Sequence, residues 1–308
     1  MPIFTRDLEC RLLDACIVAY DIKNGAIDPT VPYYDKIGIK PGTKPYVFVD
    51  GVENINAGFV AETYDDWVFL VYRGTLPPFK GDFWAWIADW LNDFRIGPMN
   101  WYVNNSYYGQ VETGFGSAVI DLWKYVLQAL SAIDLTKKKG IIVTGHSKGG
   151  GMTFPAASLL KGLYPHMLVQ NCSFAAPLTC DRTFQTNYDN MGLKVFTVRY
   201  QNQYDIVPFL PYYPNFSMLA SAERLNNEGV NKVITEEAAF KLRNDYVRIG
   251  NLRYLASGCQ VEYGTKGQDQ ADKDIWSALE HFEFTKIVDA HSAAGRYHTC
   301  VCGVQKGD

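Results

Sequence analysis

The segment Gly145-His146-Ser147-Lys148-Gly149 has the spacing Gly-x-Ser-x-Gly, in which the side chain able to do chemistry is a serine hydroxyl. An apolar, β-branched stretch at 140–144 precedes it, and a stretch with helical spacing follows through Met152 to Lys161. A serine on so tight a strand-to-helix turn has a strained backbone, and side chains at the two flanking positions would clash there. Gly145 and Gly149 remove those side chains, so we predict that Ser147 is the nucleophile of a serine hydrolase.

The same turn has another interpretation, as a glycine-rich loop that binds phosphate or only packs tightly. A phosphate loop requires Gly-x-x-x-x-Gly-Lys-Ser/Thr, and that order is absent. The partners that a serine nucleophile needs do occur further along the chain, which favours the hydrolase interpretation.

The first of these partners is an acid. A serine hydroxyl becomes a good nucleophile when a base takes its proton, and in α/β-hydrolases the chain order is Ser, then Asp or Glu, then His. Asp205 follows a predicted strand at 194–200, and open α/β sheets place their sites at the carboxyl ends of strands. We predict Asp205 as the acid. The alternative is a turn-forming aspartate, in which case Asp181 or Asp189 would be tested.

The second partner is a histidine, and only three of the five histidines follow Asp205: His281, His291 and His298. His281 lies in a helical pattern, and His298 lies in a β-branched and cysteine-containing stretch that is typical of packed structure. His291 lies among small residues at 289–295, which suit a loop that reaches the serine. We therefore predict His291 as the base, with His298 as the second candidate.

A fold that holds these residues together is also predicted. Strand patterns at 46–49, 57–62, 67–73, 140–144, 171–175 and 194–200 are interspersed with helical patterns at 11–22, at 113–130 and after Ser147. This order predicts an α/β-hydrolase fold, with a mostly parallel sheet and helices on both faces. The absence of repeats and linkers predicts a single domain over 1–308. Towards the carboxyl end, 236–242 and 272–285 appear partly helical, and 292–302 fits either a helix or a strand.

Composition excludes several classes of protein. The chain is 47% hydrophobic and 20% charged, with a net charge of −4 and no long basic tract, so we expect no nucleic-acid partner. It has no apolar window of about 18 residues, so we expect no transmembrane segment. The N-terminus lacks the apolar run of a signal peptide, which predicts a cytoplasmic protein or one whose leader has been removed. The sequence carries no signal for an oligomeric state.

Seven cysteines are scattered along the chain, and this odd number favours reduced core thiols over a disulfide framework. Cys300-x-Cys302 has no second Cys/His pair that accompanies it in the sequence, so we expect no metal site there.

These motifs together resemble the class 3 lipase family, which includes fungal triacylglycerol lipases and plant phospholipase-like enzymes. The resemblance runs from about residue 70 to 291, and its motifs occur in the family's order. Besides the nucleophile turn, the matching segments are Arg73-Gly74-Thr75, Asp89-Trp90-Leu91-Asn92-Asp93, Gly114-Phe115, Phe174-Ala175-Ala176-Pro177 and Asp205-Ile206-Val207-Pro208-Phe209-Leu210-Pro211. The Asp289-x-His291-Ser292 segment, with Tyr297 after it, is similar to the family's closing histidine segment. Three positions depart from the pattern: Glu112 and Arg248 stand where histidines are expected, and Lys148 stands where leucine is common.

The resemblance implies an acyl-enzyme mechanism on a lipid or other ester, without a cofactor. Its oxyanion hole would use the backbone N–H groups of Thr75 and Lys148. The family also places a mobile lid after the oxyanion segment, where this chain has Phe79, Phe83, Trp84, Trp86 and Ile87. The segment starts at Pro77-Pro78 and has Gly81 as a hinge. A buried helix is the alternative for that segment. A lid would imply transient contact with a lipid interface.

Two other functions remain open at this stage. One is an esterase, a phospholipase or an acyltransferase that acts on more polar esters, which chain-length profiling would identify. The other is a non-catalytic lipid-binding relative, which a fluorophosphonate label on Ser147 would exclude.

Overall fold

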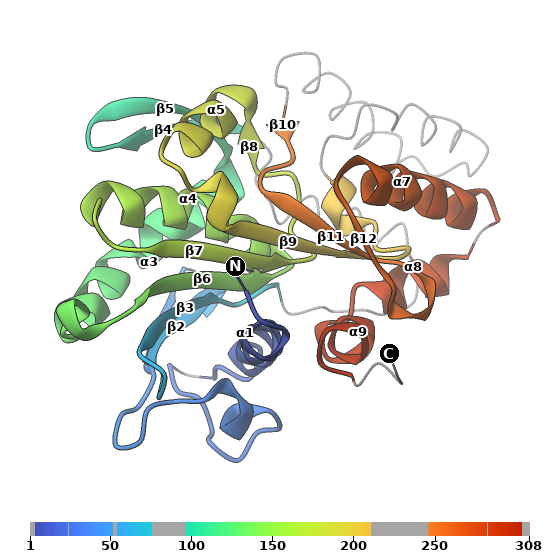
Figure 1. The fold of residues 1–308 in the computed structure, drawn as a ribbon. Coiled ribbons are helices and arrows are strands. Elements are labelled where there is room, and N and C mark those ends of the chain that lie inside the picture. Colours follow the sequence, from blue (N-terminus) through green and yellow to red (C-terminus); the bar gives the residue numbers. More distant parts are fainter. Residues whose placement is uncertain are drawn as a thin grey trace.

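The computed structural model describes residues 4–23, 25–51, 54–75, 97–210, 246–281 and 283–303. Its centre is an eight-stranded sheet with the order β1-β2-β3-β6-β7-β9-β11-β12 (Figure 1). The five strands from β3 to β11 are parallel, and β1, β2 and β12 are antiparallel to their neighbours. The strands are β1 Tyr46–Asp50, β2 Asn56–Glu62, β3 Trp67–Tyr72, β6 Gly140–His146, β7 Val169–Phe174, β9 Thr197–Asn202, β11 Asn251–Leu255 and β12 Val261–Tyr263. The predicted α/β-hydrolase fold class, with a mostly parallel sheet, is confirmed.

Helices cover both faces of this sheet, so its central strands are buried on both sides. Val68 and Leu70 of β3 pack into one hydrophobic core, and Phe69 and Val71, which point the opposite way, pack into another. Helices α3, α4, α5, α7 and α8 contribute to the first core, and α1 and α9 contribute to the second. The helices are α1 Arg6–Ala19, α3 Thr113–Ser131, α4 Lys148–Leu163, α5 Arg182–Asn190, α7 Gly264–Glu280, α8 Phe284–Ala290 and α9 His298–Cys302.

A second, four-stranded sheet was not predicted from the sequence. Its order is β10-β8-β5-β4, with β4 Pro98–Val103, β5 Ser106–Glu112, β8 Cys180–Asp181 and β10 Tyr246–Val247. The side chain of Trp101 in β4 is buried and donates from Nε1 to Ser158 Oγ of α4 at 3.0 Å. This bond attaches the second sheet to the helix that follows Ser147.

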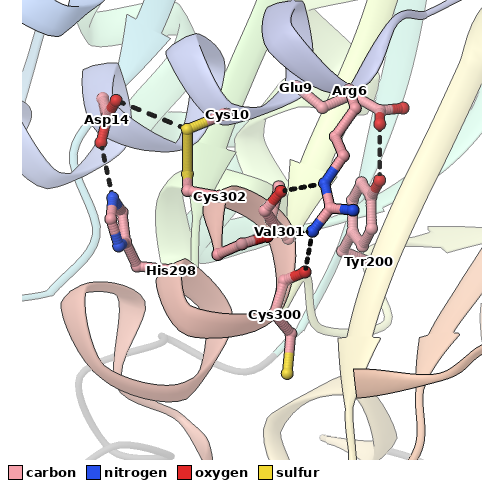
Figure 2. The surroundings of a disulfide bond; sticks show 10 residues. Arg6, Glu9, Cys10, Asp14, Tyr200, His298, Cys300, Val301 and Cys302 are labelled. Atoms are coloured by element: carbon pink, nitrogen blue, oxygen red, sulfur yellow. Dashed lines mark hydrogen bonds and ion pairs between the residues drawn. A yellow bond between two sulfur atoms is a disulfide. The ribbon is translucent and has the colours of Figure 1, made fainter. Parts of the chain in front are cut away.

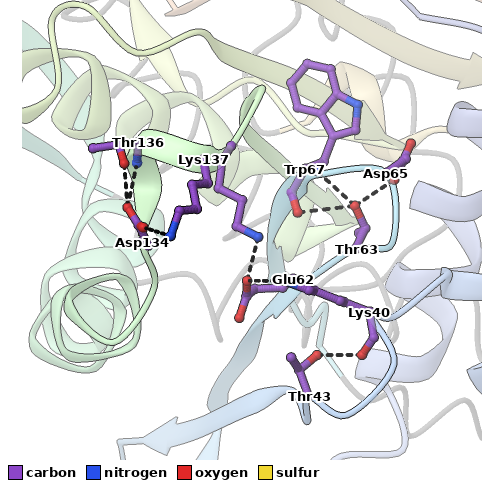
Figure 3. A network of polar contacts seen from close by, with 10 residues as sticks. Lys40, Thr43, Glu62, Thr63, Asp65, Trp67, Asp134, Thr136 and Lys137 are labelled. Atoms are coloured by element: carbon purple, nitrogen blue, oxygen red, sulfur yellow. Dashed lines mark hydrogen bonds and ion pairs between the residues drawn. The ribbon is translucent and has the colours of Figure 1, made fainter.

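The turn from β2 to β3 is fixed by its own polar side chains (Figure 3). Thr63 Oγ1 accepts from the Trp67 backbone N–H at 3.0 Å and donates to Asp65 Oδ1 at 2.7 Å. Asp66 has a positive φ of 65°, a conformation that aspartate tolerates better than most residues. These contacts position β3, whose carboxyl end leads towards the candidate site.

Several elements begin at other residues, or are of another type, than the sequence predicted. The first helix begins at Arg6 rather than near residue 11, because Thr5 caps it by accepting from the Leu8 N–H at 3.3 Å. The strand predicted at 194–200 begins at Thr197, after a 3-10 turn over Lys194–Phe196. The segment predicted as helix or strand at 292–302 is helical, with a π-type segment Ala293–Tyr297 before α9. The helix predicted at 236–242 lies outside the described residues.

The prediction of reduced core thiols was wrong for four of the cysteines. Disulfides join Cys10 to Cys302 and Cys259 to Cys300, while Cys16, Cys172 and Cys180 are buried thiols. The first bond links residues 292 positions apart, because α9 packs beside α1 (Figure 1). No spacing rule in the sequence reveals such a pairing. Within the described part of the chain, no helix is long and apolar enough to cross a membrane.

Glu112 is fully buried at the N-terminus of α3, where its Oε2 accepts from the Phe115 N–H at 3.1 Å. Burial raises the pKa of this carboxyl group to about 8. Because the pKa in the folded state lies above the ordinary value, the neutral form stabilises the fold most fully below about pH 4.5. This stabilisation is lost as the pH rises through about 8.

We therefore expect Glu112→Gln, which keeps the capping acceptor and cannot ionise, to gain stability relative to the wild type as the pH rises. The difference in free energy of unfolding between variant and wild type should shift by on the order of 3 kcal/mol between about pH 4.5 and 8.5. Urea unfolding at a series of pH values measures it. A constant difference across this window would contradict a raised pKa at Glu112.

Candidate active site

The turn between β6 and α4 holds Ser147 in a conformation that few L-residues adopt. Its φ is 60° and its ψ is −127°, and it is 3% exposed. A Cβ atom on Gly145 would lie 2.3 Å from the Gly149 carbonyl, and one on Gly149 would lie 2.2 Å from the Tyr72 carbonyl oxygen. Both contacts are shorter than real Cβ atoms allow, so the two glycines are required for α4 to pass this close to β6 and β3.

His291 lies between Ser147 and Asp205 and is hydrogen-bonded to both. Its Nε2 is 2.8 Å from Ser147 Oγ, and its Nδ1 is 3.0 Å and 3.1 Å from the two oxygens of Asp205. The histidine side chain is 13% exposed, whereas the aspartate is fully buried. The three residues come from the β6–α4 turn, the loop after β9 and the C-terminus of α8, so only the folded sheet brings them together.

Besides His291, two donors hold the Asp205 carboxylate. The Val207 N–H donates to Oδ1 at 3.0 Å, and the Tyr297 hydroxyl donates to Oδ2 at 2.7 Å. The Tyr297 oxygen in turn accepts from the Asn202 N–H at 2.9 Å. These contacts fix the carboxylate plane and keep both oxygens directed at the imidazole, as a buried charge requires.

His146, next to the serine, is a second imidazole in this cluster. Its ring centroid lies 4.8 Å from that of His291, and its Nδ1 is 2.8 Å from the Tyr20 hydroxyl. Burial, together with the charge that His291 can carry, holds the pKa of His146 well below its usual range. Its environment therefore favours the neutral imidazole.

The predicted oxyanion donors border the same turn. Lys148 is the first residue of α4, so its backbone N–H belongs to the positive end of that helix. Thr75 follows Gly74, where a Cβ atom would lie 2.1 Å from the Tyr20 hydroxyl and 2.8 Å from the His146 carbonyl oxygen. The segment after β3 thus packs directly against the nucleophile turn. The Lys148 ammonium points elsewhere and donates to Asn56 Oδ1 at 2.8 Å.

The other candidates from the sequence lie elsewhere. His298 bonds Asp14 at 3.1 Å, and His281 Nδ1 contacts the Ser277 carbonyl oxygen at 2.7 Å. Asp181 caps α5 through the Phe184 N–H, and Asp189 pairs with Lys194 at 3.2 Å. The predicted lid residues Phe79, Phe83, Trp84, Trp86 and Ile87 lie outside the described residues, as does the Asp89 to Asp93 motif.

Two supporting residues were not given a role from the sequence. Tyr297 was used only as a marker for the preceding histidine, and Tyr20 was not considered. Tyr297 could have been suspected because it closes the histidine segment. Tyr20 lies at the end of α1, far from any motif, and only the packing of α1 under the sheet brings it to His146.

A serine on a strained strand-to-helix turn, hydrogen-bonded through an imidazole to a carboxylate beyond a parallel strand, places this chain among the α/β-hydrolases. Within that class the lipase (class 3) family matches residues 70–214. Over this stretch the chain resembles the class 3 lipase family, and the match supports a serine-dependent enzyme that hydrolyses lipid esters. The predicted family, activity and enzyme class are confirmed.

Solved structures agree with this fold at low sequence identity. The Rhizomucor miehei triacylglyceride lipase is 17% identical, with a TM-score of 0.59, and the match covers 83% of this chain and 82% of that one. A triacylglycerol lipase from Penicillium expansum is 12% identical, with a TM-score of 0.58 and coverage of 88% and 89%. A mono- and diacylglycerol lipase from Aspergillus oryzae is 17% identical, with a TM-score of 0.54 and coverage of 87% and 84%. The comparison with curated protein sequences found no match.

Proposed function

We propose that Ser147, His291 and Asp205 form the catalytic triad of this lipase and that its substrates are acylglycerols. His291 takes the proton from Ser147 Oγ as the oxygen attacks the ester carbonyl, and then gives it to the leaving alcohol. Water attacks the resulting acyl-enzyme in the same way and releases the fatty acid. Asp205 holds the imidazole in the required tautomer and stabilises its positive charge.

The observation that carries the assignment is the chain of hydrogen bonds from Ser147 Oγ through both nitrogens of His291 to Asp205. It supplies a nucleophile, a base and an orienting carboxylate. The distances between their hydrogen-bonded atoms all lie within the roughly 2.6–3.2 Å that proton transfer needs. The backbone N–H groups of Thr75 and Lys148 would receive the oxyanion, and loss of one such donor typically costs about 3 kcal/mol of transition-state stabilisation.

The acylglycerol preference rests on the fungal lipases whose folds match this one. We also propose that the enzyme makes transient contact with a lipid interface. We expect faster hydrolysis of emulsified triglyceride and diglyceride than of phospholipid, with a rise in rate once the substrate exceeds its solubility.

A panel of p-nitrophenyl esters, acylglycerols and phospholipids tests this preference, with Ser147→Ala as the background control. A rate that saturates smoothly through the solubility limit, on short soluble esters only, would assign the enzyme to the esterases instead. Highest turnover on phospholipid would assign it to the phospholipases.

A further inference from the structure

We propose that the reduced protein binds one Zn²⁺ ion through four side chains that join the two ends of the chain: Cys10, Asp14, His298 and Cys302. In the oxidised protein the two cysteines form a disulfide, so the bond and the ion are alternative ways to hold α1 against α9 (Figure 2). This site is separate from the serine site and needs no part of the proposed mechanism.

The four side chains come from two matched pairs. Cys10 and Asp14 are four residues apart on α1, and His298 and Cys302 are four residues apart on α9. Residues at this spacing lie on one face of a helix, one turn apart. The two faces meet where α1 packs beside α9, so each helix contributes one sulfur ligand and one harder ligand.

The distances suit a tetrahedral ion. One ligand atom from each residue lies within 4.8 Å of the other three. Cys10 Sγ is 3.7 Å from Asp14 Oδ2, and His298 Nε2 is 3.1 Å from Asp14 Oδ1. A tetrahedral zinc site with bonds of about 2.0–2.3 Å separates its ligands by about 3.3–3.8 Å. Reduction lets the two sulfur atoms move apart, which is the main change that the site requires.

The donor set also selects the ion. Thiolates favour zinc over magnesium and calcium, and mixed Cys and His ligands are typical of structural zinc. Two thiolates and one carboxylate carry three negative charges, so a bound Zn²⁺ leaves a net charge of −1. The positive charge of Lys36 attracts the Asp14 carboxylate and partly offsets this net negative charge. The Tyr33 ring lies 4.9 Å from that of His298 and limits its rotation.

Exchange between the two forms is chemically balanced. A phosphine reductant breaks the S–S bond by supplying two electrons. One water molecule gives its oxygen to the phosphine, which becomes a phosphine oxide, and its two protons to the sulfur atoms, which become thiols. Zinc then binds as both thiols release their protons to solvent. Asp14 is buried, whereas Cys10, His298 and Cys302 are partly exposed, so the reductant and the ion can both reach the site.

The proposal is tested by measuring zinc on the full chain before and after reduction with a phosphine. Zinc content is measured after gel filtration, and affinity by competition with a chromophoric chelator. We expect about one zinc per reduced chain and none at this site in the oxidised chain. Zinc should also raise the melting temperature of the reduced protein.

Variants separate this site from other zinc-binding groups. His298→Ala and Asp14→Asn should each weaken zinc binding at least about tenfold, because each removes one ligand but neither prevents the disulfide. His281→Ala is the matched histidine control, and Cys259→Ser combined with Cys300→Ser removes the other disulfide. Both controls should keep the single zinc.

Replacement by Co²⁺ should give a thiolate-to-metal absorption band that reports the two sulfur ligands. Absence of zinc from reduced protein that keeps its far-ultraviolet spectrum would overturn the proposal, as would unchanged affinity in both His298→Ala and Asp14→Asn. If reduction unfolds the chain, recovery of the fold on addition of zinc supports the site, and failure to recover overturns it.

Discussion

Ser147→Ala is expected to lower kcat for ester hydrolysis by about 10⁶-fold, to the level of the uncatalysed reaction plus what binding and the oxyanion donors provide. The substitution removes the oxygen that attacks the carbonyl and keeps the Cβ atom. The strained backbone at φ 60° is therefore unchanged, and the stability of the fold should change little. Intact mass after reaction with a fluorophosphonate should show one adduct on the wild type and none on the variant.

Ser173→Ala is the matched control for this experiment. Ser173 is also fully buried, in the neighbouring strand β7, and its hydroxyl has no hydrogen-bond partner among the described residues. Loss of that hydroxyl should leave turnover and labelling at the wild-type level. A fluorophosphonate adduct that persists in Ser147→Ala, or turnover within about tenfold of the wild type, would remove Ser147 from the proposed role.

The sequence was most informative where a backbone constraint leaves few residue choices. The glycines at 145 and 149 predicted a close approach of the turn to its neighbours, and the structure shows that any Cβ atom there would overlap the backbone. Continuous apolar runs likewise made the central strands recognisable, because each of these strands must face two cores at once. Local steric rules of this kind can be read without knowledge of distant contacts.

Features that depend on contacts between distant segments could not be predicted in this way. The disulfide from Cys10 to Cys302 and the bond from Tyr20 to His146 join residues far apart in the sequence, and both depend on how α1 packs beneath the sheet. The same limit applies to β8 and β10, which have two residues each. They are strands only because β8 pairs with β5 and β10 pairs with β8. Strands this short show no periodic pattern of apolar residues in the sequence.

The choice among the three histidines depended both on local sequence and on contacts between distant segments. Small residues around 291 and the resemblance to the family favoured His291, while His298 stayed the second candidate because its β-branched and cysteine-containing stretch is typical of packed structure. The structure places His298 on α9, hydrogen-bonded to Asp14, and places His291 at the C-terminus of α8, within reach of the serine. The difference follows from the direction in which the chain turns between these two helices, which sequence spacing does not define.

His291→Ala is expected to lower kcat by about 10⁶-fold, comparable with loss of the serine, because the triad acts as a unit and the serine hydroxyl is a weak nucleophile without its base. The effect should fall on kcat with little change in KM, since His291 acts on the proton and not on the acyl chain. Removal of the imidazole also leaves the Asp205 carboxylate buried without one of its partners, so a moderate loss of stability should accompany the loss of rate.

His298→Ala is the matched control, because it removes an imidazole that also bonds a buried aspartate. Asp14 is 1% exposed and its oxygen lies 3.1 Å from His298 Nε2. This variant should lose stability in the same way, yet its kcat at a temperature where it remains folded should stay close to the wild-type value. Initial rates on a p-nitrophenyl ester, with unfolding followed by circular dichroism, measure both quantities. If His298→Ala lost activity by orders of magnitude while His291→Ala kept more than about a hundredth of it, the base would have to be reassigned, because a missing triad base costs far more than that.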